Sequence, residues 1–490
     1  MRHIKYILLI FIFPLSIAAQ PKVTMTMEEC IRLASQQSLE AFLAKNTYLV
    51  SYWDNRSYKA SKLPSLDLES TPFSFYNGIT QNWDSEDDIY VTSQTKRLQS
   101  SAELQLNQQI TLTGGTLSLT TGNSLLNNYV TEPTYTSDVV SIKYTQKLNG
   151  YNSFRWESKI NPLEFESAKK AYIEEREDIA IQAIQKFFDL AQAQITLDIS
   201  ERNLDNAEEL YKIGTGRFEV GTITQDELLS LELDLYNSQL AKVKAEQNLV
   251  RKRTSLNIFL NIDRNTIIEC IIPEEISPIE IPVSKALEKA IENSPTVKNL
   301  DIKLLKSEQN LSQVKANNRF SSTLNLSYGL NGNNEDFVSS YDNLGDKQSA
   351  NLSFNIPIID WGEGKGNVSV AQAQLEAQKI SKQKALIQFE ENVTNTTLEF
   401  NLQKRQVENS AKADTIAQKG YQISYEIFKL GKLDVIKLNQ ARTSQVQARE
   451  DYISALKSYW VYWYTIRQLT LYDFENDVAL TEDFDALINK

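Results

Sequence analysis

Apolar residues follow two different periods along the chain, and these periods divide it into helical and extended stretches. Over residues 163–218 and 366–428 apolar residues recur every three or four positions, which predicts long amphipathic helices. Elsewhere apolar and polar residues alternate, which predicts strands with one apolar and one polar face. The alternating stretches are 63–76, 104–121, 140–148, 323–330 and 351–358. Shorter helices are predicted over 27–62 and 283–317, the second interrupted at Pro295.

One stretch of the helical pattern occurs twice. Tyr211 to Gly221 returns as Tyr421 to Gly431, 210 residues later, with Tyr, Ile, Phe and Gly at the same four spacings. A Gly just past a helix end supplies the positive φ that a tight turn needs. Apolar and small residues resume after each Gly and reach about residues 263 and 473. Each copy therefore predicts the tip of a long antiparallel helical hairpin.

The 210-residue offset also divides the chain into repeats. We expect a first repeat over 20–263, a connector over 264–282, a second repeat over 283–473 and a C-terminal tail over 474–490. The connector is short, acidic and proline-bearing, so it is predicted to be irregular. The tail is acidic and weakly patterned, so loose packing is expected. The hairpin pattern over 104–121 has no counterpart in the second repeat.

The N-terminal residues indicate export. Residues 1–19 combine two basic residues, an apolar run and small residues near position 19, as a secretory signal peptide does. After this leader no segment has 18 consecutive apolar residues, so no transmembrane helix is predicted. Cys30 and Cys270 are the only cysteines. In an oxidising compartment they could form a disulfide, and two buried free thiols are the equal alternative.

Composition argues against several classes of function. The formal net charge of −12 is unfavourable for a nucleic-acid-binding surface. The only histidine is His3, inside the leader, so a zinc site or a His-based catalytic triad has no natural ligand or base. Gly214-Thr-Gly216 does not follow a strand, so it does not fit a nucleotide-binding loop. We expect no enzyme activity, no catalytic or metal site and no cofactor.

The lengths of the predicted elements suggest a membrane protein. About 65 residues of helix extend roughly 95 Å, which no small globular domain contains. Alternating strands of about ten residues are typical of membrane β-barrels. Four strands from one chain cannot close a barrel, so several copies must share one. The residues expected to face lipid are Leu324, Leu326, Tyr328, Leu352, Phe354 and Ile356. A periplasmic coiled-coil adaptor or scaffold is the alternative, and it would leave the alternating strands unexplained.

The duplicated order of strands, long helix, tip and return helix resembles the TolC family of outer-membrane efflux proteins. The tips Phe218-Glu-Val-Gly221 and Phe428-Lys-Leu-Gly431 share this resemblance, as does the junction Pro357-Ile-Ile-Asp360-Trp361-Gly362. The resemblance implies an α+β membrane protein, a homotrimer with a twelve-stranded barrel in the outer membrane and a long α-helical barrel through the periplasm. It implies an exit duct for efflux or type I secretion, with a periplasmic adaptor, an inner-membrane pump and outer-membrane lipid as partners. The adaptor would bind the tips at Phe218, Gly221, Phe428 and Gly431.

Two features depart from the family pattern. Acidic residues just beyond the tip glycine would form a ring at the periplasmic constriction; Asp226 and Glu227 fit this, whereas the second copy has Asp434 followed by Lys437. The second departure is the extra hairpin over 104–121. It would add strands to the barrel or form an extracellular or plugging element, and we expect extra strands.

Overall fold

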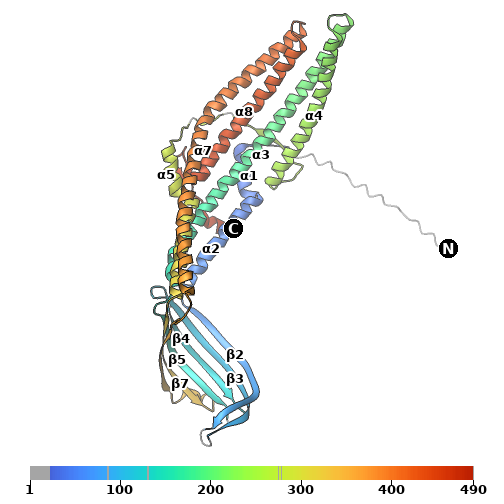
Figure 1. Cartoon of the computed structure of the whole chain (residues 1–490). Helices are drawn as coiled ribbons and strands as arrows, with labels where there is room; N and C mark the ends of the chain where they lie inside the picture. The colour runs from blue at the N-terminus through green and yellow to red at the C-terminus, as the bar shows by residue number, and fades with distance from the viewer. Residues whose placement is uncertain (1–21, 85–87, 130–131, 274, 278, 489–490) are drawn as a thin grey trace, which may run out of the picture. The chain divides into compact units, whose positions relative to one another are not determined.

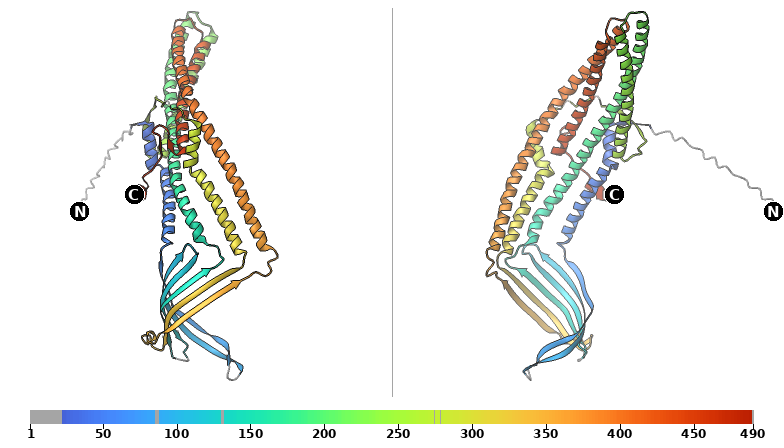
Figure 2. Two further views of the ribbon diagram at one scale, coloured as in Figure 1. Left: turned by 90° about the vertical axis from the view of Figure 1, so that its left-hand side faces the viewer. Right: turned by 45° about the vertical axis from the view of Figure 1, so that its right-hand side comes forward.

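A computed structural model describes residues 22–84, 88–129, 132–273, 275–277 and 279–488 (Figures 1 and 2). The predicted signal peptide, 1–19, lies outside them. The described chain falls into two compact units, one that holds a β-sheet with the helix ends next to it and one that is mainly helical. The first unit comprises Thr47–Ala171 and Ser294–Glu390, and the second comprises the remaining segments.

The first unit is built on one antiparallel sheet of six strands. These are β2 (Ser65–Asp84), β3 (Ile89–Ile110), β4 (Gly115–Asn127), β5 (Thr134–Lys147), β7 (Ser321–Asn334) and β8 (Gly345–Asn355), in the order β2-β3-β4-β5-β7-β8. The 3₁₀ turn η1 (Ser339–Tyr341) lies between β7 and β8. The sheet has two strands more than the four counted for the repeats, because the predicted hairpin over 104–121 belongs to β3 and β4, which lie inside the sheet. The expectation of extra strands is met in this sheet.

The turn of that hairpin depends on Gly114. Its φ is +76°, a conformation that glycine adopts without the clash that a Cβ would cause. Residues 104–110 of β3 then pair with residues 115–121 of β4, as the alternating pattern predicts. β2 and β3 are longer than predicted, and their pairing continues to Asp84 and Ile89, beyond the last β3–β4 pair at Leu98 and Asn127.

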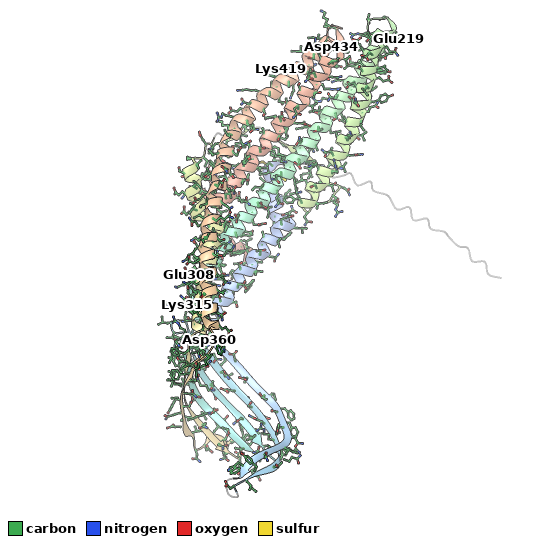
Figure 3. The ribbon with its side chains drawn as sticks, viewed as in Figure 1. Glu219, Glu308, Lys315, Asp360, Lys419 and Asp434 are labelled. Atoms are coloured by element: carbon green, nitrogen blue, oxygen red, sulfur yellow. The ribbon has the colours of Figure 1, made fainter. Side chains whose placement is uncertain are left out.

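Four long helices form the two hairpins. They are α3 (Ser153–Glu219) and α4 (Gln225–Phe259) in the first hairpin, and α7 (Glu363–Lys429) and α8 (Val435–Thr470) in the second. α3 and α7 each contain 67 residues, which corresponds to about 100 Å of helix. α3 begins ten residues earlier than predicted and includes Pro162, which lacks the N–H for one intrahelical hydrogen bond. Asp360, labelled in Figure 3, accepts hydrogen bonds from the backbone N–H groups of Gly362 and Gly364 and so supports the start of α7.

The short helices before the strands are broken at a serine in both halves of the chain. α1 (Met27–Gln37) and α2 (Leu39–Ala60) meet at Ser38, and α5 (Val283–Asn293) and α6 (Pro295–Asn317) meet at Ser294. Both serines are buried, and each hydroxyl accepts a hydrogen bond from the first turn of the following helix. The pattern predicted the second break at Pro295 and missed the first, where Ser38 caps α2 without a proline.

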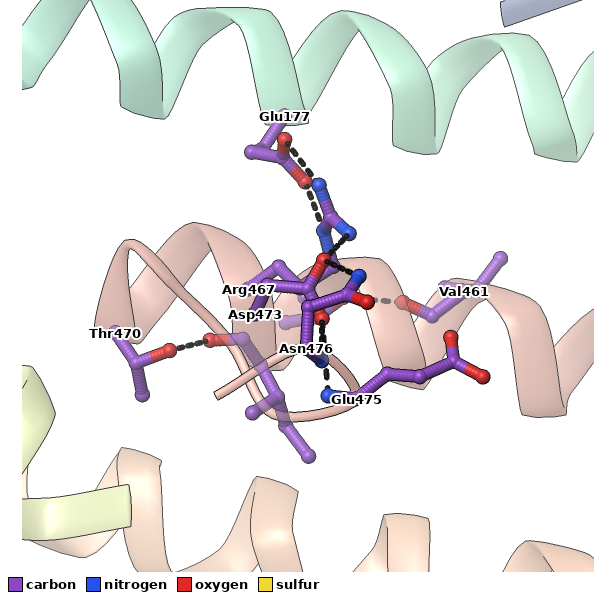
Figure 4. Close-up of polar contacts among 9 residues, drawn as sticks. Glu177, Val461, Arg467, Thr470, Asp473, Glu475 and Asn476 are labelled. Atoms are coloured by element: carbon purple, nitrogen blue, oxygen red, sulfur yellow. Dashed lines mark hydrogen bonds and ion pairs between the residues drawn. The ribbon is translucent and has the colours of Figure 1, made fainter. Parts of the chain in front are cut away.

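The connector and the tail are more regular than the sequence suggested. β6 (Ile267–Ile271), inside the predicted connector, pairs in parallel with β1 (Lys22–Thr26), so the prediction of an irregular connector is wrong for these five residues. The described residues that follow β6, up to Pro282, form no helix or strand, as predicted. In the tail, β10 (Val478–Ala479) pairs with β9 (Tyr472–Asp473), and α9 (Phe484–Ile488) places the Phe484 ring against Tyr172. The tail is thus more regular than predicted, while none of its described residues, 474–488, is buried. Figure 4 shows Arg467 of α8 between Glu177 of α3 and Asp473, an arrangement that fixes the start of this segment.

Cys30 and Cys270 are free thiols in this structure. The Cys30 Sγ lies 3.8 Å from the carbonyl oxygen of Ala183, and burial raises the pKa of the thiol to about 12. Burial also raises the pKa of Cys270. Cys30 therefore serves as a small core residue, and Cys270 packs half-buried beside the core. Within the described residues, no helix has an apolar stretch long enough to cross a membrane.

Candidate functional site

The two hairpin tips have the same backbone geometry. Gly221 and Gly431 have φ values of +73° and +75°. The N–H of Gly221 donates to the carbonyl of Phe218, and that of Thr222 donates to the carbonyl of Arg217, both at 2.9 Å. Gly431 and Lys432 make the equivalent bonds to Phe428 and Ile427. This is the Schellman arrangement, in which a left-handed residue closes a helix end.

Each return helix begins with a side-chain cap. The Thr224 hydroxyl accepts a hydrogen bond from the Glu227 N–H, and the Glu227 carboxylate accepts one from the Thr224 N–H, which makes a capping box for α4. Asp434 caps α8 by accepting the Lys437 N–H at 2.8 Å, and this bond lowers the pKa of the Asp434 carboxyl. Figure 3 marks Glu219 and Asp434 near the ends of their hairpins. Three of the four residues proposed for the constriction thus take part in caps.

The hairpins pack against each other just behind the tips. The buried residues of this cluster come from all four long helices and are Leu210, Leu231, Tyr421, Tyr425, Phe428, Val435 and Leu438. The repeat is not symmetric here, because Phe428 is 5% exposed and Phe218 is 41% exposed. Of the two phenylalanines predicted to bind a partner, only Phe218 presents its ring to solvent in the described chain.

Arg217 of the first hairpin closes over the end of the second. Its guanidinium donates hydrogen bonds to the carbonyl oxygens of Phe428, at 3.3 Å, and Lys429, at 2.7 Å. These carbonyls belong to the last turn of α7, where the intrahelical partners end and a cation is favourable. The same guanidinium lies 5.7 Å from the centre of the Phe428 ring. A side chain on one tip therefore caps the helix of the other.

A second set of polar contacts lies two turns behind the tips. The Tyr421 hydroxyl accepts a hydrogen bond from Asn206 at 3.0 Å. Glu209 accepts hydrogen bonds from the Lys429 ammonium and the Tyr425 hydroxyl, which together hold the pKa of Glu209 below its usual range. Burial, followed by the bond to Glu209, raises the pKa of Tyr425. The two hairpins are thus joined by charged as well as apolar contacts.

Sequence reasoning missed two exposed apolar residues at the tips. Val220 and Leu430 occupy equivalent positions, immediately before the two glycines, and are 74% and 70% exposed. The repeat could have indicated them, because both copies carry a large apolar residue where a solvated turn would ordinarily be polar. Val220, Gly221, Leu430 and Gly431 together form the exposed tip surface.

The residues predicted to face lipid lie on β7, on β8 and at the end of β8. Leu326, Tyr328, Leu352, Phe354 and Ile356 are exposed, and Leu324 is half-buried. In the described residues, no three His, Cys, Asp or Glu side chains gather in a way that could hold a metal ion.

Comparisons with known proteins agree with this architecture. The sequence pattern described as outer membrane efflux protein matches residues 92–261 and 286–470, one segment in each repeat. The chain belongs to the outer membrane efflux protein family. Membership makes it an outer-membrane channel protein with a helical extension into the periplasm, from a family of channels rather than enzymes. A comparison with curated proteins found no match.

Solved channels of this family have the same fold at low sequence identity. The CmeC outer membrane channel of Campylobacter jejuni is 15% identical, with a TM-score of 0.65 over 94% of this chain and 88% of its own. VceC of Vibrio cholerae is 12% identical, with a TM-score of 0.62 over 91% and 95%. The open state of MtrE of Neisseria gonorrhoeae is 14% identical, with a TM-score of 0.58 over 93% and 90%. The predicted TolC-like fold with an internal repeat is confirmed.

Proposed function

We propose that three copies of the chain form the outer-membrane exit duct of a tripartite efflux or type I secretion system. The sheets of the three copies make the barrel wall in the lipid, and the long hairpins make the periplasmic tunnel. A periplasmic adaptor binds the tips and joins the duct to an inner-membrane pump. Substrate leaves the pump, enters the tunnel and passes through the barrel to the exterior.

The observation that carries this proposal is the two-faced sheet with open edges. Its outer strands, β2 and β8, are each paired on one side only among the described residues. Unpaired backbone groups in hydrocarbon cost several kcal/mol each, so a sheet of this kind is stable in a membrane only when other strands cover its edges. Copies of the same chain provide such strands. The apolar positions Leu324, Leu326, Tyr328, Leu352, Phe354 and Ile356 then contact lipid.

The adaptor site is assigned to the exposed tip surface, with Phe218 beside it. A positive-φ glycine leaves no side chain to hold a partner helix away, and Val220 and Leu430 offer apolar area next to it. Asp226, Glu227, Asp434 and Lys437 follow the tips and are the candidates for lining the periplasmic constriction. A capped carboxylate keeps its negative charge, so a role in capping is compatible with a role in ion selection.

A coiled-coil adaptor or scaffold made only of helical hairpins does not account for the chain. Such a protein needs no sheet, whereas this chain contributes four strands from its first repeat and two from its second to one six-stranded sheet. The six-stranded sheet and the family therefore favour the channel.

Current through a planar bilayer tests the proposal. Purified protein should insert in discrete conductance steps. Closed tips would restrict this current, so the same measurement is made on the double variant Arg217→Ala/Arg442→Ala. This variant lacks two contacts between the hairpins, and its conductance should be higher. If both proteins are folded and neither gives steps, the chain is not a duct.

A further inference from the structure

Hydrogen bonds connect the polar face of the sheet across the six strands. Asn107 of β3 donates to Asp67 of β2 at 3.3 Å, and Ser118 of β4 donates to Asn107 at 2.6 Å. Further contacts join β5 to β3, β5 to β7, and β7 to β8. They are Lys143 with Glu103 at 3.0 Å, Thr145 with Asn325 at 3.0 Å, and Ser327 with Ser349 at 2.8 Å. The extra strands thus share one polar face with the strands that both repeats possess.

The opposite face is apolar and exposed in the same continuous way. One row of directly opposed residues runs from β2 to β7 and consists of Leu66, Leu106, Leu119, Ile142 and Tyr328. All five are exposed, and on β8 the exposed apolar positions are Leu352 and Phe354. A face of this kind suits lipid, and it extends over β2, β3 and β4 as well as β5, β7 and β8. β3 and β4, which form the hairpin over 104–121, therefore have the character of wall strands rather than of a plug, and so does β2.

The two edge strands of the sheet, β2 and β8, run in directions that allow them to pair between neighbouring copies. Because six antiparallel strands separate them, β2 and β8 run in opposite directions, so β8 of one copy can pair antiparallel with β2 of another. β8 is exposed along all its length, and β2 is exposed from Ser65 to Asn77. Edge strands that carry apolar residues and lack a cover are the standard place for addition of a strand from another chain.

We propose that all six strands enter the barrel, with β8 of each copy bound to β2 of the next, so that the trimer has eighteen strands. The inference rests on the proposed trimeric duct and corrects the twelve strands that the family resemblance implied. Barrel diameter grows roughly linearly with strand number, so the opening is about one and a half times as wide as that of a twelve-stranded barrel. The duct then admits bulkier solutes at its outer end, past the polar face that carries Asp67, Glu69 and Glu103.

The stagger of the strands is that of a closed barrel. A row of opposed residues that starts at Ser65, the first residue of β2, reaches Ser349 on β8. Ser349 precedes Asn355, the last residue of β8, by six positions. If Ser65 and Asn355 lie at the same level of the barrel, the row shifts by six residues over the five steps between the six strands. With the usual rise per residue and spacing between strands, this shift corresponds to a tilt of the strands from the barrel axis of about 40°. Closed membrane barrels have tilts of about 35–45°.

The same stagger predicts the register between copies. The next step, from β8 of one copy to β2 of the neighbouring copy, shifts the row by about one more residue. Asn355 then lies opposite the first two residues of β2 in the neighbouring copy. Opposed residues must also share a face, so polar positions pair with polar ones. Ser353 of one copy is therefore opposite Asp67 or Glu69 of the next, and Leu68 lies on the other face.

Disulfide cross-linking between copies tests the eighteen-stranded barrel. In a Cys30→Ala/Cys270→Ala background, Ser353→Cys is combined with Asp67→Cys or with Glu69→Cys. After oxidation, one of these pairs should link the chains of the folded trimer into covalent dimers and trimers. Ser353→Cys with Leu68→Cys is the matched control on the opposite face and should give much less product. Each single cysteine should give none.

A twelve-stranded barrel made of β4, β5, β7 and β8 alone predicts another product. If β2 and β3 lie outside the wall, β4 becomes the edge strand, and Ser353→Cys should cross-link to Ser118→Cys instead. A trimer that gives this product, or one that gives neither β2 cross-link, overturns the inference while leaving the trimeric duct intact. Protein that is folded but monomeric before oxidation contradicts the proposed duct itself, and the eighteen-stranded barrel with it.

The size of polymer that enters from the outer side gives an independent measurement. Polyethylene glycols of increasing mass are added to the side of a planar bilayer that faces the barrel, and the largest polymer that lowers the conductance is recorded. The expected cut-off diameter is about one and a half times that of a twelve-stranded channel measured alongside. An equal cut-off would overturn the wider opening.

Discussion

Arg442 on α8 forms a two-pronged ion pair with Asp234 on α4 and so ties the second hairpin to the first. One guanidinium nitrogen lies 2.9 Å from a carboxylate oxygen, and the other nitrogen contacts the second oxygen. Asp234 is 8% exposed, so its charge depends on this partner rather than on water. The planar guanidinium fits the carboxylate in a way that Lys cannot reproduce.

Removal of Arg442 should therefore destabilise the hairpins. Arg442→Met leaves the Asp234 charge buried and unpaired, which costs about 3–5 kcal/mol. Arg442→Met/Asp234→Leu removes both charges and should recover most of this loss. Limited proteolysis near the tips and thermal unfolding measure the difference. If the single variant is as stable as the double variant, the pair does not hold the hairpins together.

Two substitutions of a tip glycine distinguish a role in the turn from a role in binding the adaptor. Gly431→Ala and Gly431→Trp impose the same strain at φ +75°, about 1 kcal/mol, but only Trp adds bulk to the exposed tip surface. Trp should abolish cross-linking of the periplasmic adaptor from a photoreactive residue at Val220, and Ala should retain it. Both variants should still form trimers, because the buried cluster behind the tips is unchanged. Equal loss in both variants would mean that the glycine serves the turn alone.

Charge on the apolar face of the sheet should prevent insertion. Leu326→Arg should cost about 2–4 kcal/mol if the residue lies near the middle of the bilayer. Ser327→Arg, one residue on and on the polar face, is the matched control and should assemble. The yield of folded trimer in outer membranes, read from unheated gels, compares the two. Normal assembly of Leu326→Arg would refute its contact with lipid.

Glu174 on α3 should make stability depend on pH. Burial, with smaller contributions from the Glu175 and Asp178 charges, raises the pKa of Glu174 from 4.5 to about 7. The folded chain therefore binds more protons than the unfolded chain between these values, and stability falls as pH rises from about 4.5 to about 7. Glu174→Gln should remove this slope and stabilise the protein above pH 7 by about 3 kcal/mol at most. An unchanged slope in thermal unfolding scans would assign the pH dependence to other groups.

The tips could be predicted from sequence because their chemistry is local. A positive-φ glycine, a capping threonine or aspartate and the helical period on each side all lie within about fifteen residues. The same holds for the hairpin at Gly114, whose turn and alternating strands are contiguous.

The features that the sequence did not predict depend on contacts between residues that are far apart in the chain. Phe218 and Phe428 occupy equivalent positions in the repeat, and only the packing of the two hairpins buries one and exposes the other. The pairing of β1 with β6 joins segments more than 240 positions apart, and no local pattern in the connector signals it. The outer parts of β2 and β3 lack strict alternation, so the pattern ended the first of these strands near Tyr76, began the second near Leu104 and underestimated the length of both. Register and neighbours, rather than propensity, decide whether such a segment is a strand.

The mass of the intact assembly tests the central claim most directly. Protein extracted from outer membranes in a mild detergent is measured by native mass spectrometry without heating. The open edges of β2 and β8 predict a particle of three copies that dissociates to one copy only when the sheet unfolds. A stable, folded single copy in the outer-membrane fraction would show that the edges need no partner, and it would contradict the shared barrel and the duct built on it.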